Sequence, residues 1–146
     1  MSDLSTLLDT ENRPVMVADI SSLVDDAITN LSGITGMTVK GALSAARKAN
    51  GDIVPQAVDN LLPDILGDLQ SHWEDYQESD QQDFGAFLQS RADGVSESLL
   101  STADRAVEQK GGGAVAKVYN SLRGRGTKLV APHIPALGRI IDNHMR

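Results

Sequence analysis

The chain has 146 residues, of which 40% are hydrophobic and 23% are charged, and its formal net charge is −7. This composition is that of a folded globular protein, and the length predicts a single domain over residues 1–146. The absence of cysteine excludes disulfide bonds, thiolate metal ligands and cysteine nucleophiles. No signal peptide is recognisable, and no stretch approaches the roughly 18 apolar residues of a membrane span. We therefore expect a cytoplasmic protein.

The charge is unevenly distributed along the chain. Residues 52–97 contain eleven acids and one base, Arg91, whereas residues 110–146 contain seven bases and one acid, Asp142. Such oppositely charged parts either attract each other within one fold or face different partners.

Apolar residues recur at helical spacing nearly throughout, and no stretch alternates as a strand would. Residues 3–8 predict one or two helical turns. A helix then begins after Asn12, with Pro14 near its first position, where the missing N–H of proline has no cost. Its apolar stripe consists of Ile20, Leu23, Val24, Ala27, Ile28 and Leu31.

Glycines are expected to separate this helix from the next. Gly33 and Gly36 would end the first helix and form a short turn. The following helix is predicted from about residue 38 to residue 50, and Gly51 ends it because a residue without a Cβ adopts the left-handed conformation at little cost. This helix is the one in the first half of the chain that has no acid, and it carries Lys40, Arg47 and Lys48.

Two prolines indicate where the helices of the next segment begin. Pro55 is expected to open a short helix over residues 55–62. Pro63 cannot donate a hydrogen bond to the preceding turn, so a separate, longer helix is predicted from Pro63 to about Gln77. One broad face of it would hold Leu61, Ile65, Leu69, Trp73 and Tyr76.

The sequence Ser79-Asp80-Gln81-Gln82 has the pattern of a capping box, which predicts a helix start at Ser79. The helix would run to about Gln109. Gly94 lies inside it and is expected to kink or split it, so the sequence leaves open whether residues 80–109 form one helix or two.

The glycine run over residues 111–113 predicts a break between helices. A basic helix is expected over residues 114–123, then a turn over residues 124–126, then a last helix bent near its start by Pro132 and Pro135. Together, these segments predict an all-α fold, an irregular or orthogonal bundle of six to eight helices with proline bends.

One set of side chains has metal-ligand spacing. Asp64, Asp68 and His72 lie four residues apart, which places two carboxylates and an imidazole along one side of a helix. A second helix would have to complete the site, and no HExxH or Glu-x-x-His pair supplies it. The alternative interpretation is a solvated acidic edge.

The basic C-terminal stretch is the strongest charge signal. Its side chains could contact phosphates of a nucleic acid or another anion. The alternative is pairing with the acidic helix over residues 63–80, which needs no partner and agrees better with the acidic pI of about 4.8. The residues concerned are Lys117, Arg123, Arg125 and Lys128.

Catalytic motifs are absent from the sequence. There is no Gly-x-Ser-x-Gly, and no Gly-x-x-x-x-Gly-Lys-Ser/Thr accompanies the glycine run. The sequence therefore predicts no catalytic residue and no cofactor, and whether the chain is an enzyme stays open, with the balance against it.

Several blocks together resemble a family of small actinobacterial proteins of unknown function. They are residues 11–14 and 17–19, 39–42, 53–59, 61–63, 84–85 with 90–93, and 118–119 with 122–124. The resemblance covers nearly the whole chain. It implies a bacterial cytoplasmic protein and assigns no activity and no site residue.

Three functions are compatible with these patterns. The favoured one is a non-enzymatic interaction or scaffold module that binds a protein partner or associates with itself through a helix face. The first alternative is a nucleic-acid-associated accessory protein that uses the basic C-terminal helices. The second alternative is a metal- or small-ligand-binding protein that uses Asp64, Asp68 and His72.

Overall fold

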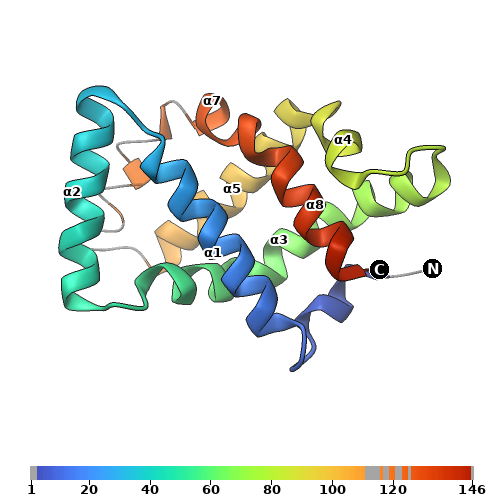
Figure 1. Ribbon diagram of the computed structural model, residues 1–146, viewed down its shortest axis with the longest axis horizontal. Helices are drawn as coiled ribbons and strands as arrows, with labels where there is room; N and C mark the ends of the chain where they lie inside the picture. The colour runs from blue at the N-terminus through green and yellow to red at the C-terminus, as the bar shows by residue number, and fades with distance from the viewer. Residues whose placement is uncertain (1–2, 111–115, 117–118, 121–122, 125, 146) are drawn as a thin grey trace.

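The computed structural model describes residues 3–110, 116, 119–120, 123–124 and 126–145 (Figure 1). Over these residues the chain is all-helical and contains no strand, which confirms the predicted fold class. No helix within this part is long and apolar enough to cross a membrane. The elements are η1 (Leu4–Leu8), α1 (Arg13–Thr29), α2 (Gly33–Ala49), α3 (Ile53–Glu78), α4 (Phe84–Gln89), α5 (Ala92–Lys110), α7 (Gly126–Val130), η2 (Ala131–His133) and α8 (Ile134–Met145).

The core is built around α3, the longest helix described. It packs against η1, α1, α4 and α5, while α8 lies against α1 and α4. Its buried residues recur every three or four positions, as one apolar stripe requires. They are Val54, Val58, Leu62, Leu66, Leu69 and Trp73. At one end of the stripe the Trp73 ring meets the ring of Phe84 edge-on, with their centroids 4.9 Å apart.

Two glycines bring α4 and α8 into close contact. A Cβ on Gly138 would lie 2.6 Å from the Cα of Gly85, and a Cβ on Gly85 would lie 2.4 Å from the carbonyl oxygen of Pro135. Neither position has room for a side chain, so the crossing of these helices depends on both glycines.

The first elements largely follow the sequence pattern. η1 forms as expected and is capped by Asp3, whose side chain accepts from the backbone N–H of Ser5 at 2.8 Å. α1 begins at Arg13 with Pro14 in its first turn.

The expected turn at Gly33 and Gly36 is wrong, because α2 already begins at Gly33 and contains Gly36. Gly33 has φ of +69°, a value that glycine adopts without strain. Gly36 is required by packing: a Cβ there would lie 2.7 Å from the carbonyl oxygen of Leu31.

The expected break at Pro63 is also wrong, because α3 is one helix from Ile53 to Glu78 with Pro63 inside it. Proline removes the hydrogen bond to the carbonyl four residues earlier, which belongs to Asp59. Arg13 of α1 replaces this donor: its Nη2 donates to the Asp59 carbonyl oxygen at 3.0 Å, and its Nε donates to the Asp59 side chain at 2.6 Å.

The capping box is a third wrong prediction. Ser79 follows the C-terminus of α3, and its hydroxyl donates to the Tyr76 carbonyl oxygen at 2.6 Å. The next helix, α4, begins at Phe84 and is capped by Asp83, which accepts from the backbone N–H of Gly85 at 2.8 Å. The sequence left open whether residues 80–109 form one helix or two, and the structure shows two helices, α4 and α5. They are separated at residues 90–91, and Gly94 lies inside α5.

The C-terminal part is described from Gly126 on. The expected break at residues 111–113 and most of the expected helix over residues 114–123 lie outside the described residues. The bend expected from Pro132 and Pro135 is confirmed, since η2 separates α7 from α8 there.

Candidate functional site

Helix α2 lies at one edge of the molecule and, among the described elements, packs mainly against α1 (Figure 1). Its buried positions include Val39 and Ala46. On other sides of the helix, Ile34 is 85% exposed and Met37 is 77% exposed. These two large apolar side chains, one turn apart, are therefore not part of the core.

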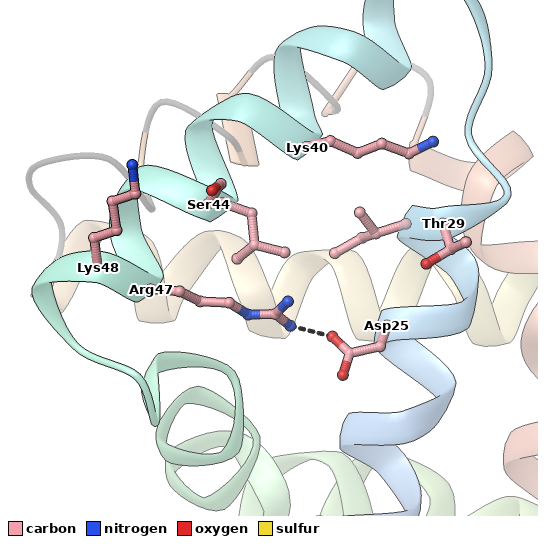
Figure 2. A pocket seen from close by; sticks show the side chains of 8 residues that line it. Asp25, Thr29, Lys40, Ser44, Arg47 and Lys48 are labelled. Carbon is pink, nitrogen blue, oxygen red and sulfur yellow. Dashed lines mark hydrogen bonds and ion pairs between the residues drawn. The ribbon is translucent and has the colours of Figure 1, made fainter.

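A groove of about 490 Å³ opens between α1 and α2 (Figure 2). This volume falls within the roughly 300–1,000 Å³ of small-molecule sites. From α1 the groove is lined by Asp25, Ile28 and Thr29, and from α2 by Lys40, Leu43, Ser44, Arg47 and Lys48. Three bases and one acid therefore surround it, although the chain as a whole carries an excess of acids.

Two cations of the groove are held by neighbours on α1 and on the segment between α1 and α2. Arg47 Nη2 donates to the Asp25 carboxylate across the groove, and Figure 2 shows this ion pair. Lys40 Nζ donates to the carbonyl oxygen of Leu31 at 3.1 Å. Both side chains are directed from α2 toward α1, whereas the ammonium of Lys48 points away from Asp25.

The predicted metal ligands lie along α3, each in a different environment. Asp64 is exposed, and Asp68 accepts a hydrogen bond from the hydroxyl of Thr102 in α5. His72 Nδ1 lies 3.3 Å from Nη1 of Arg91. Within the described residues, no three His, Asp or Glu side chains are grouped as a metal ion would need.

The environment of His72 favours its neutral form. Burial lowers the pKa of the imidazole, the positive charge of Arg91 lowers it further, and the charge of Asp75 acts in the opposite direction. Arg91 is itself held by Asp75 at 2.8 Å and lies over the Phe87 ring, 4.5 Å from its centroid. Arg91 and His72 thus belong to one contact between α3 and the start of α5.

The basic C-terminal residues are placed only in part. Arg123 Nε donates to both oxygens of Asp104 in α5, at 2.9 and 3.2 Å, and the Tyr119 hydroxyl also donates to Asp104. The acidic partner of Arg123 is therefore on α5, and the expected pairing with residues 63–80 is wrong for this residue. Lys128 is exposed on α7, and Lys117 and Arg125 lie outside the described residues.

These contacts shift the pKa values of the groups that make them. The hydrogen bonds from Arg123 and then Tyr119 lower the pKa of Asp104, since they stabilise its charged form. Burial, followed by the hydrogen bond to Asp104, raises the pKa of Tyr119. Arg123 is thus bound to α5 through Asp104.

Sequence reasoning did not find the α1–α2 groove. The sequence did contain one indication of its basic side, because α2 has no acidic residue although the chain as a whole is acidic. The other half of the groove comes from α1, and nothing in the sequence placed Asp25 opposite Arg47.

The fold and the site define an all-helical protein with an open, mainly basic groove at one edge. The chain belongs to a family that is described as "Family of unknown function (DUF6918)", whose model matches residues 4–145. This confirms the resemblance to a family of unknown function, while the actinobacterial source stays a prediction. No curated protein and no solved structure matches the chain.

Proposed function

We propose that this protein is a single-domain, cytoplasmic, non-enzymatic interaction module that contacts an acidic partner protein through the outer face of α2. The observation that supports this function most strongly is the exposure of Ile34 and Met37 on a helix without acids. We refer to these two residues as the α2 patch.

The α2 patch has the properties of a contact that a partner would cover. Burying an aliphatic side chain of this size fully contributes roughly 1.5–3 kcal/mol, so two such residues can anchor a small interface. Lys48 follows on the same helix, its ammonium points away from Asp25, and it favours a partner of negative charge. Charge complementarity at this acid-free helix therefore favours an acidic segment of the partner protein.

The nucleic-acid alternative has less support. Arg123 is bound to Asp104, which reduces its availability to a phosphate. The metal alternative through Asp64, Asp68 and His72 stays a prediction, which elemental analysis of protein purified without chelator tests.

The proposed function is tested with a double variant, Ile34→Ser/Met37→Ser, and a matched control. Val15 on α1 is also an exposed apolar residue, at 48%, so Val15→Ser removes a smaller exposed apolar side chain elsewhere. Tagged wild type and both variants are used to capture proteins from the native cell. Each captured protein is then purified and titrated against the three chains at low and moderate salt.

We expect one partner with an acidic segment that binds wild type and Val15→Ser equally and binds the double variant at least tenfold more weakly. Its affinity should fall as salt rises, because charge attraction contributes. Equal binding of the double variant would contradict the role of the α2 patch. A wild-type dimer in light scattering that dissociates in the double variant would also contradict it, since a second copy would then be the occupant.

A further inference from the structure

We infer that the α1–α2 groove is a binding site for a small dianion whose two carboxylates are joined by an aliphatic chain. This goes beyond the proposed function, because the ligand is a small molecule in the groove and the α2 patch does not line the groove. The protein partner depends mainly on the α2 patch, and the small ligand depends mainly on Lys40 and Arg47.

The order of side chains along α2 supports a ligand that is charged at both ends. Lys40 and Arg47 are seven residues apart, so their Cα atoms are about 10.5 Å apart along the helix axis. Leu43 comes between them in the sequence and lines the same groove. Across from it, α1 contributes Ile28. The register thus gives a cation, an apolar stretch and a second cation in succession.

Both cations can accept a ligand while keeping the contacts that hold them. Lys40 donates to the Leu31 carbonyl oxygen, and an ammonium group has three donors in total. Arg47 is paired with Asp25, and a guanidinium has five N–H donors in a planar fork that suits carboxylates. The hydrogen bonds already present orient the two side chains toward α1 before any ligand arrives.

The charge of the groove selects an anion. Its lining holds Lys40, Arg47 and Lys48 against Asp25 alone, so the groove remains positive after the ion pair is counted. Thr29 and Ser44 add hydroxyl groups that can donate to a carboxylate. A monoanion with the same chain would contact only one of the two cations and is expected to bind more weakly.

The test is a titration of the whole chain with suberate, followed by amide NMR shifts and by calorimetry. Octanoate has a chain of equal length with one carboxylate, and succinate has both carboxylates on a chain too short to span the groove. We expect suberate to bind at least tenfold more tightly than either compound, with shifts concentrated on residues of α1 and α2. Equal affinity for octanoate or succinate, or no binding of suberate, would overturn the inference.

Variants locate the site. Lys40→Gln and Arg47→Gln should each weaken suberate binding about tenfold. Arg139→Gln is the control, since Arg139 is an exposed base on α8 with a distant acidic neighbour, 3.9 Å from Asp83, and suberate should bind this variant as it binds wild type. Arg47→Lys keeps the charge and should retain part of the affinity, which separates ligand contact from altered folding. Wild-type affinity in both glutamine variants, or an equal loss in Arg139→Gln, would exclude this groove.

Discussion

Arg13 donates to the backbone oxygen of Asp59 at 3.0 Å, and this is the carbonyl that Pro63 leaves without its helical donor. The same guanidinium also binds the Asp59 side chain at 2.6 Å. One side chain at the start of α1 thus completes a hydrogen-bonding pattern in the middle of α3. This contact lets α3 continue through a proline that would otherwise favour a break.

The first prediction concerns this contact. Arg13→Ala should lower the free energy of unfolding by about 1–2 kcal/mol, because a partly buried carbonyl loses its donor. Asp59→Asn weakens the ion pair and keeps the carbonyl bond, so it should cost less than about 1 kcal/mol, as expected for a partly exposed pair. Urea unfolding measures both.

A double-mutant cycle identifies the role of Pro63. In a Pro63→Ala background the helix supplies its own donor to the Asp59 carbonyl, so Arg13→Ala should cost clearly less than in the wild type. An equal cost in both backgrounds would mean that Arg13 does not replace the missing hydrogen bond.

The second prediction concerns the crossing of α4 and α8. Gly138→Ala should destabilise the protein by about 1–3 kcal/mol, because the added methyl would lie against the backbone of Gly85. Gly67→Ala in α3 is the control: no atom lies within 4 Å of the added Cβ, so a gain of about 0.4–1 kcal/mol is expected. Thermal unfolding distinguishes them, and the same change in both variants would contradict the close crossing.

The third prediction is a pH dependence from His72. Its pKa is lowered below 6.5 in the folded chain, so the unfolded chain binds more protons as the pH falls through that value. The stability that His72 contributes through its lowered pKa is present above pH 6.5. It is lost as the pH falls through the pKa of His72 in the folded chain. His72→Gln should therefore show a smaller loss of stability than wild type between about pH 7 and pH 5. Parallel urea midpoints for the two proteins over this interval would contradict the lowered pKa.

The fourth prediction concerns Asp104. Its folded pKa lies below the ordinary value of 3.8, so its contribution to stability is present above that value and is lost as the pH falls through the folded pKa. Arg123→Gln removes the largest cause of the shift, and the pKa of Asp104 should rise toward 3.8. Carboxyl NMR titration measures this directly, and an unchanged pKa would show that Arg123 does not hold this carboxylate.

The helical class of the fold could be predicted from apolar spacing, because stripes such as Ile20, Leu23 and Val24 follow the period of the helix and lie in or against the core. Helix ends were harder to predict. Pro63 and Gly36 were expected to interrupt helices, and both lie inside them because of partners that sequence periodicity does not reveal. For Pro63 the partner is Arg13, and for Gly36 it is the backbone of Leu31.

Local capping signals were ambiguous for a similar reason. Ser79 and Asp83 are both good cap residues, and the helix begins after Asp83, where Phe84 enters the core beside Trp73. At the candidate site, the cations of α2 could be identified from the sequence. The groove could not be predicted, because it exists only where α1 packs beside α2 and places Asp25 opposite Arg47.

Photo-cross-linking in the native cell tests the role of the α2 patch most directly. A photoreactive amino acid replaces Met37 in one chain and Val15 in a second chain, which serves as the control. We expect the probe at position 37 to trap one acidic protein that the probe at position 15 does not trap. An acidic partner at α2 would be contradicted if both probes cross-linked the same proteins. It would also be contradicted if the probe at position 37 cross-linked only a second copy of this chain.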